Sequence, residues 1–195
     1  MPWPEEHKQQ TRDRIVAAAA TALRANGVDG VSIADIMADA GLTHGGFYAH
    51  FASKEDLLSA ALRRASHETT DRLSNAMRSA PQDRRVHAVI DAYLSPMHAE
   101  HPEHGCPVAA LGPELTRAGG DVQRNLGDGI DRRIAWLQEL LAGDSHAKET
   151  ATAIVACTLG GIVLARAAGP EHSDAVLAAT RSFLHHALEN QSQDG

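Results

Sequence analysis

The chain is short of cysteine and has no long apolar run. Its 195 residues include two cysteines, Cys106 and Cys157, which are too few for a disulfide framework. No segment approaches the roughly 18 consecutive apolar residues of a membrane helix. The first residues, MPWPEEHKQQTR, lack the apolar core of a signal peptide. We therefore expect a soluble, cytoplasmic protein with no membrane partner.

Motifs that carry catalysis are missing as well. The chain has no glycine-rich phosphate loop, no G-x-S-x-G motif and no paired carboxylates. His98, His101 and His104 recur at a spacing of three, but Pro102 interrupts the helix that would align them. No cluster of Cys or Asp completes a ligand set around these histidines. We expect no catalytic residue, no metal and no cofactor.

Positive charge is scarce, and the net charge of −7 is unfavourable for a protein that binds nucleic acid. The acidity is uneven, however. Up to Arg64 the chain has seven Lys and Arg against eight Asp and Glu, whereas the remainder has 11 against 17. Lys8, Arg12, Arg14 and Lys54 can therefore form a basic rim that meets phosphates. Modest non-specific affinity for DNA follows, so dimerisation and paired half-sites would have to supplement it.

Helical periodicity dominates the rest of the pattern, and no strand-like alternation is present. The sequence predicts an all-α protein in which glycine and proline separate the helices. Besides two short helices between residues 32 and 51, we expect helices at 6–25, 53–78, 83–99, 108–117, 121–141, 146–168 and 172–190.

The most informative segment is Ser32–Phe51, SIADIMADAGLTHGGFYAHF. Its first part has apolar residues at i, i+3, i+4 and i+7, which is typical of one buried face of a short helix. Ser32 is placed to cap that helix, and Gly41 to end it with a positive φ. Thr43 can begin a second short helix. The segment therefore predicts a helix-turn-helix.

The second short helix has an apolar and a polar face. Its two phenylalanines, four residues apart, would face inward. The residues expected on the outer face are Thr43, His44, Gly45, Tyr48 and His50. An alternative for Tyr48 is an amphipathic core residue.

The run Ile-Ala-x-x-x-x-x-Ala-Gly-Leu-Thr-x-Gly-x-Phe-Tyr-x-His-Phe-x-Ser-Lys-Glu-Asp-Leu-Leu, at residues 33–58, resembles the DNA-binding domain of the TetR family of transcriptional repressors. The resemblance covers about residues 11–62. It implies an N-terminal three-helix DNA-binding domain at 8–69 and a helical effector-binding and dimerisation domain at 70–195. The implied function is a homodimeric repressor that binds an inverted-repeat operator in double-stranded DNA.

The same resemblance assigns roles on the helix-turn-helix. Thr43, His44 and Gly45 would enter the major groove, where His44 could donate to a guanine. Tyr48 and His50 are similar to a phosphate-contacting pair of the family. Ser32, at the start of the first short helix, and Lys54, at the start of the next long one, complete the predicted DNA-binding residues. Many relatives carry Lys or Arg near the position of His44 and a hydroxyl residue at the position of Gly46. Because this chain differs there, the preferred base sequence cannot be predicted.

Cys106 is the sharpest feature of the C-terminal part. It follows three histidines and precedes an expected helix, and both the helix N-terminus and His98, His101 or His104 could lower its pKa. The Gly-Cys-Pro-Val segment is similar to one in a branch of TetR regulators, some of which sense electrophiles or oxidants through such a cysteine. The hypothesis is a thiol sensor whose modification releases DNA. The alternative is that Cys106 is an unreactive small residue packed at the start of a helix.

The last two expected helices carry small and apolar residues on one side, which allows helices to approach closely. Packing within the chain would explain the same pattern for any one residue. The resemblance favours a homodimer interface, and a two-fold dimer also places two recognition helices about one DNA turn, ~34–36 Å, apart.

Large apolar residues between the same helices could form core or a ligand cavity. The resemblance implies a pocket there for a small hydrophobic or electrophilic effector, which would tilt the helix at 53–78 and separate the recognition helices. The residues expected at the pocket or sensor are Tyr93, Met97, Cys106, Leu111, Leu115 and Trp136.

Two other functions also agree with the sequence. A helical hydrolase or transferase could use Cys106 with His104, and it would lose turnover in Cys106→Ser. A helical DNA-binding or scaffolding protein without a sensor would show no change of DNA affinity with any metabolite or oxidant.

Overall fold

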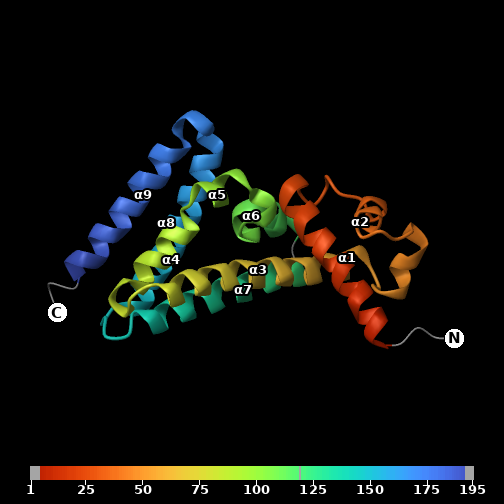
Figure 1. The fold of residues 1–195 in the computed structure, drawn as a ribbon, viewed down its shortest axis with the longest axis horizontal. Helices are drawn as coiled ribbons and strands as arrows, with labels where there is room; N and C mark the ends of the chain where they lie inside the picture. The colour runs from red at the N-terminus through yellow and green to blue at the C-terminus, as the bar shows by residue number, and fades with distance from the viewer. Residues whose placement is uncertain (1–4, 119, 192–195) are drawn as a thin grey trace.

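The computed structural model describes residues 5–118 and 120–191, and helices make up most of this part of the chain (Figure 1). The elements are α1 Glu5–Asn26, α2 Ile33–Asp39, η1 His44–Ala49, α3 Lys54–Ser79, η2 Gln82–Arg84, α4 Arg85–Tyr93, α5 Pro96–Glu100, η3 Pro102–His104, α6 Pro107–Ala118, α7 Gly120–Leu140, α8 Ala147–Ala168 and α9 Pro170–Gln191. The elements marked η are 3₁₀ helices. Within the described ranges no strand is formed, and the expected all-α fold is confirmed.

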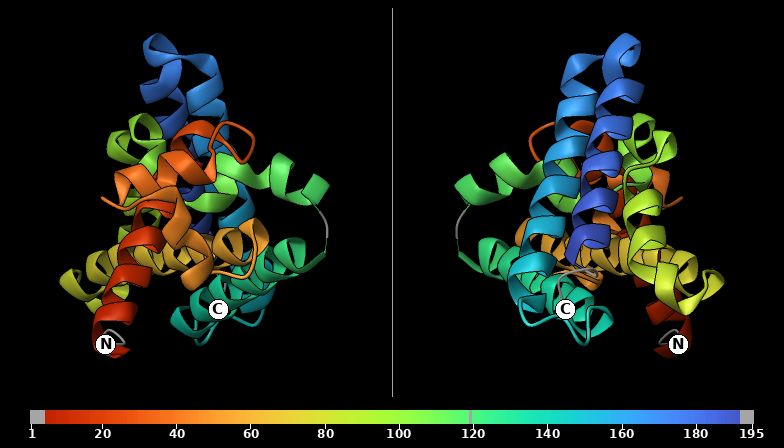
Figure 2. Two further views of the ribbon diagram at one scale, coloured as in Figure 1. Left: turned by 90° about the vertical axis from the view of Figure 1, so that its right-hand side faces the viewer. Right: turned by 90° about the vertical axis from the view of Figure 1, so that its left-hand side faces the viewer.

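The helices form two groups joined by α3 and α7. α1, α2 and η1 lie at one end of the molecule, whereas α8 and α9 lie toward the other (Figure 1). α3 and α7 run side by side between the two groups, as the turned views also show (Figure 2). Leu57 and Leu73 of α3 belong to different cores, one in each group. A shift of α3 therefore affects both ends of the protein.

The first core lies among α1, α2, η1 and the first half of α3. Its largest fully buried side chains are Ile15, Ile36, Met37, Phe47, Phe51 and Leu57. Leu111 and Leu115 of α6 belong to this core as well. The expected division into 8–69 and 70–195 therefore falls within α3, across a shared core, and residues 192–195 lie outside the described residues.

Local signals define the helix-turn-helix as expected. The Ser32 hydroxyl accepts the N–H of Asp35 at 3.1 Å, and the Asp35 carboxylate accepts the N–H of Ser32 at 3.3 Å. This reciprocal pair is a capping box. Gly41 ends the helix with φ of +70°, where a Cβ would be strained. The second short helix is a 3₁₀ helix of six residues, because Gly45 and Gly46 weaken α-helix formation and Thr43 makes no side-chain cap.

The expected continuous helix at 83–99 is wrong. α4 ends at Tyr93, and α5 begins at Pro96 after Ser95 caps it by accepting the N–H of His98. Pro96 has no N–H and disfavours helical backbone at the residue before it. The break turns the chain so that α5 and η3 bring His98 beside the segment that contains Cys106.

α8 is long and apolar enough to cross a membrane by length and composition, with a mean hydropathy of 1.8 over its most apolar stretch. One such helix is weak evidence, because the core helix of a soluble protein has the same properties. α8 packs against α7 and α9, and it buries Ala151, Ile154 and Ile162 in the second core.

Candidate functional site

The outer face of η1 is uncovered. Thr43, His44 and Gly45 are exposed, and Tyr48 is 71% exposed, whereas Phe47 between them is fully buried. Phe47 stacks on Phe51 with ring centroids 5.6 Å apart, and this packing fixes the direction of the helix. These residues are therefore accessible, the core alternative for Tyr48 is wrong, and contact of the residues with DNA stays a prediction.

A basic group adjoins this face. The Arg12 guanidinium lies 4.2 Å from the centroid of the Phe51 ring, which places its charge beside η1. Burial, followed by the charges of Lys8 and Arg12, lowers the pKa of the half-buried His50. His50 is therefore neutral near pH 7, and its positive neighbours are the groups positioned to attract phosphate.

Lys54 and Ser32 have partners within the protein. The Lys54 ammonium donates to the carbonyl oxygens of Val28 and Val31, at 3.4 and 3.1 Å. The Ser32 hydroxyl donates to Asp35 at 2.5 Å. Both side chains thus hold the loop before α2 and the start of that helix. A DNA contact by either residue stays a prediction.

Cys106 lies in a separate buried centre. Its side chain has no exposed area, and its sulfur accepts a hydrogen bond from Nη1 of Arg133 at 3.3 Å. Burial raises the pKa of the thiol, but the Arg133 charge, the Arg133 hydrogen bond and the Ala109 backbone outweigh it. The net result is a pKa below the ordinary value. The thiolate is therefore favoured relative to an ordinary buried cysteine.

The charge beside the thiol comes from a residue that sequence reasoning missed. We expected His98, His101 or His104 to supply it. His101 and His104 are exposed, and both lie against Glu103. Arg133 is 27 residues from Cys106 along the chain, so no local spacing could indicate the contact.

His98 is buried and neutral, and its hydrogen bonds hold the segment around Cys106 in place. Its Nδ1 lies 2.7 Å from the Tyr93 carbonyl oxygen and therefore donates, while its Nε2 accepts the backbone N–H of Cys106 at 2.9 Å. Burial lowers the pKa of His98 to about 3. A Cβ added to Gly105 would lie 2.8 Å from the His98 ring, so this close packing requires glycine.

These contacts do not form the Cys–His pair that the enzyme alternative requires. His98 meets the backbone of Cys106, and the exposed His104 ring contacts Glu103 rather than the sulfur. Among the described residues, no group of three His, Cys, Asp or Glu side chains could hold a metal ion.

Arg24 connects the Cys106 segment with the DNA-binding part. From α1, this buried guanidinium donates to the Gly105 carbonyl at 3.0 Å and to the Glu68 carboxylate of α3 at 2.8 Å. Its Nε donates to the Ala20 carbonyl at 2.9 Å. A displacement of Gly105 would thus act directly on α1 and α3.

We expect Arg24→Met to lower the free energy of unfolding by about 3 kcal/mol, because the variant removes the buried charged donor of the Gly105 carbonyl and one of the two donors of Glu68. Urea unfolding would measure this loss. Arg64→Met is the matched control, since Arg64 also contacts Glu68 but is exposed. An equal, small effect in both variants would contradict the role given to Arg24.

A cavity of about 220 Å³ lies next to the Cys106 centre, among α3, α4, α6, α7 and α8. Its lining residues are Ser66, Tyr93, Val108, Leu126, Gly129, Ile130, Arg133, Ile134, Thr152, Val155, Ala156 and Leu159. Of the residues expected at the pocket, Tyr93 lines the cavity and Cys106 lies behind Tyr93 and Arg133.

The remaining expected pocket residues lie elsewhere. Leu111 and Leu115 point into the first core, which α6 shares with α1. Met97 is exposed on α5, and Trp136 packs at the edge of the second core without lining the cavity. The sequence indicated apolar character correctly but not the helix face, since α7 lines the cavity with residues such as Ile130 and Ile134 rather than with Trp136.

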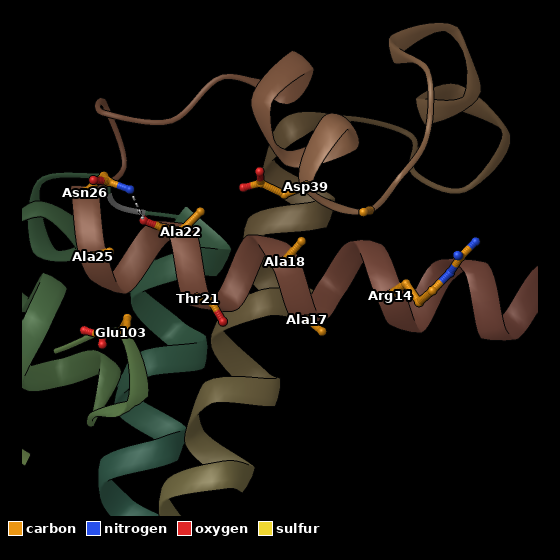
Figure 3. A pocket seen from close by; sticks show the side chains of 10 residues that line it. Arg14, Ala17, Ala18, Thr21, Ala22, Ala25, Asn26, Asp39 and Glu103 are labelled. Carbon is orange, nitrogen blue, oxygen red and sulfur yellow. Dashed lines mark hydrogen bonds between the residues drawn. The ribbon is translucent and has the colours of Figure 1, made fainter. Parts of the chain in front are cut away.

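A shallower surface groove of about 600 Å³ follows α1, where short side chains such as Ala18 and Ala22 leave space below Asp39 (Figure 3). Glu103 of η3 lies at the end of the groove near Asn26, and Arg14 lies at the other end. No cluster of metal-ligating side chains is present in this part of the described chain.

The fold and the exposed polar face of η1 define an all-α protein with an N-terminal helix-turn-helix. The profile of the family described as "Bacterial regulatory proteins, tetR family" matches residues 15–61. The regulator TtgR of Pseudomonas putida is 41% identical over 75 residues, which are 38% of this chain and 35% of TtgR. The match therefore spans about a third of the length of that curated relative.

Solved structures extend the likeness over nearly the whole chain. A TetR transcriptional regulator from Chloroflexus aurantiacus has a TM-score of 0.79 at 27% identity, covering 92% of this chain and 94% of its own. The reduced form of Escherichia coli NemR has a TM-score of 0.77 at 21% identity, covering 90% and 95%, and shows the fold alone. Residues 15–61 therefore match the DNA-binding domain of the TetR family, and the described chain has the fold of TetR regulators of known structure.

Proposed function

We propose that the protein is a homodimeric repressor that binds an inverted-repeat operator and is released from it by a small effector or by modification of Cys106. The observation that carries the DNA-binding part is the outer face of η1. There Thr43, His44, Gly45 and Tyr48 are all exposed above buried phenylalanines. Such a face suits the major groove, and the charges of Lys8 and Arg12 beside it suit phosphates.

The proposed dimer interface is the free side of α8 and α9. Large apolar side chains are exposed there: Val163 by 45%, Leu164 by 61% and Phe183 by 65%. α8 and α9 pack against each other, so two copies would join four helices. A second copy would also cover the apolar surface of α8, which accounts for its hydropathy without a membrane.

Release would begin near Cys106. The Gly105 carbonyl is held by Arg24 of α1 and lies 3.4 Å from the Thr69 hydroxyl of α3, so it joins both helices. An effector or a modified thiol that moves this segment would change the tilt of α3 and with it the separation of the two η1 faces.

Selection of bound sequences from a random duplex DNA pool tests the repressor proposal. Enrichment of an inverted repeat by the purified, folded protein is the expected result, at about 0.1 M salt, where paired half-sites outweigh non-specific attraction. If no sequence is enriched, the proposal fails. The enriched duplex would then serve as the probe for effectors and thiol reagents.

The thiol route has its own test. We expect local opening of the buried segment to set the rate at which iodoacetamide labels Cys106, and labelling to reduce operator affinity. A Cys106→Ser variant that keeps the full response to electrophiles would exclude this route.

Two variants distinguish base reading from phosphate contact. We expect His44→Ala to change the preferred bases at one position, by about 1–3 kcal/mol, because a base contact is lost. We expect Tyr48→Phe to weaken binding to all sequences alike, because a phosphate contact carries no base information. Binding of both variants to single-base operator mutants measures the difference. If His44→Ala leaves the preference unchanged, His44 is not a base reader.

A further inference from the structure

The centre around Cys106 has an excess of positive charge on half-buried arginines. Arg72, Arg133 and Arg166 extend into it, and no described carboxylate lies within 4.0 Å of any of them. Arg166 donates to three backbone carbonyls, and Arg72 has two buried nitrogens, Nε and Nη2, without a hydrogen-bond partner. Charges partly removed from water favour a partner of opposite sign, and the Cys106 thiolate can neutralise only one of these three guanidinium groups.

Arg133 is the arginine of this group that also borders the cavity. It lines the cavity wall, and its guanidinium also contacts the sulfur of Cys106 and lies 5.5 Å from the centroid of the Tyr93 ring. Cys106 itself does not line the cavity. A ligand would therefore meet the guanidinium first, and any effect on the thiol would pass through Arg133.

The cavity lining indicates which anion fits. The polar groups of Ser66, Tyr93 and Thr152 are present, but the lining includes no Asp or Glu, and most of the wall is apolar. A volume of about 220 Å³ lies below the ~300–1,000 Å³ of pockets for drug-sized ligands. Small inorganic ions would leave the apolar wall unfilled. A small molecule with one acidic head and an apolar body would satisfy both surfaces.

We propose that this cavity is a binding site for a small apolar monocarboxylate, whose carboxylate pairs with Arg133 and whose body lies against Ile130, Ile134 and Leu159. A planar guanidinium and a carboxylate form parallel hydrogen bonds, which makes this pair stronger than contacts to a neutral amide. An effect of the bound acid on DNA affinity rests on the proposed function. Binding of the acid to the cavity does not depend on it.

The acid and the Cys106 thiolate compete for the same guanidinium. When the carboxylate holds Arg133, the thiolate loses its nearest positive charge and the thiol holds its proton more tightly. Linkage is reciprocal, so ionisation of Cys106 weakens binding of the acid by the same factor. A bound acid therefore makes Cys106 less reactive, and the protein with acid bound should react more slowly with electrophiles.

Calorimetry of the full chain without DNA tests the site. The probes are isobutyrate, benzoate and phenylacetate, each paired with its uncharged amide of nearly the same shape. We expect at least one acid to bind with one molecule per chain, and its amide to bind at least about tenfold more weakly, since a charged pair is replaced by a neutral one. The amide comparison uses the unaltered protein and needs no variant.

Two arginine variants and one thiol measurement complete the test. Arg133→Met should remove the preference for acid over amide, whereas Arg132→Met, the exposed neighbour on α7, should retain it. In a Cys157→Ser background, the thiolate absorbance of Cys106 should titrate at higher pH with the bound acid than with the amide.

Binding of no acid in the series, equal affinity for acid and amide, or an unchanged preference in Arg133→Met would each overturn the proposal. So would a thiol titration that the acid does not move. The selection of operator sequences tests the repressor proposal and does not depend on these measurements. Failure of the acid site and failure of the repressor proposal can therefore be told apart.

Discussion

Acidification from pH 7 to 5 will lower the free energy of unfolding, and His98 will account for about 2 kcal/mol of the loss. The folded state holds the pKa of His98 at about 3, whereas an unfolded histidine titrates near 6.5. Below pH 6.5 the unfolded chain therefore binds a proton at this histidine, whereas the folded chain does not. Stability falls as the pH falls toward 3, at up to about 1.4 kcal/mol per pH unit, and the loss ends below that value.

Urea unfolding of the wild type and His98→Ala across this pH range isolates the effect. At pH 7 the variant should be about 3 kcal/mol less stable, because the Tyr93 carbonyl and the Cys106 N–H lose their partners without access to water. Its pH slope should be shallower than that of the wild type. His50 and His87 also have lowered pKa values and contribute in the same direction, so the difference between the two proteins is the relevant quantity.

His101→Ala is the control, since this histidine is exposed and differs little from His98 in position along the chain. It should keep the wild-type slope. If His98→Ala also keeps that slope, His98 is not the buried neutral group that the structure shows.

A single charge on the free face of α9 will separate the proposed dimer and remove most of its DNA affinity. We expect Phe183→Glu to be monomeric, because a carboxylate would have to be buried without a partner in the interface. A monomer occupies one half-site at a time, so affinity for an inverted repeat should fall by about 100-fold or more. Affinity for an isolated half-site should not change.

Sedimentation and operator titration measure the two effects together. Phe183→Leu is the matched variant, because it keeps an apolar side chain at the same exposed position, and it should remain dimeric. A dimeric Phe183→Glu protein would place the interface elsewhere, and a monomer with full operator affinity would contradict the need for two half-sites.

The helix-turn-helix could be predicted closely because its signals are local. Ser32 caps α2 through Asp35, Gly41 takes a positive φ, and Ser53 caps α3, each within a few residues of its partner. The inward direction of Phe47 follows from helical spacing alone. Local chemistry decided these features, and tertiary contacts did not override it.

The Cys106 centre could be predicted only in part. The sequence indicated a thiol with a lowered pKa, and the predicted causes were the helix N-terminus and nearby histidines. The Ala109 backbone in the first turn of α6 contributes, but the charge comes from Arg133 of α7 and not from a histidine. The contact between Arg24 and Gly105 spans 81 residues and has no periodic pattern. Long-range pairs of this kind depend on how helices pack, and a single sequence does not encode them in its spacing.

The close approach of His98 to Gly105 restricts which residues can replace either one. A side chain at position 105 would clash with the imidazole, and it would also come within 3.0 Å of Nη2 of Arg166. A chain that keeps the histidine must keep the glycine, and loss of the histidine alone would leave the contact with Arg166. Loss of the histidine would also cost the buried Cys106 amide its acceptor.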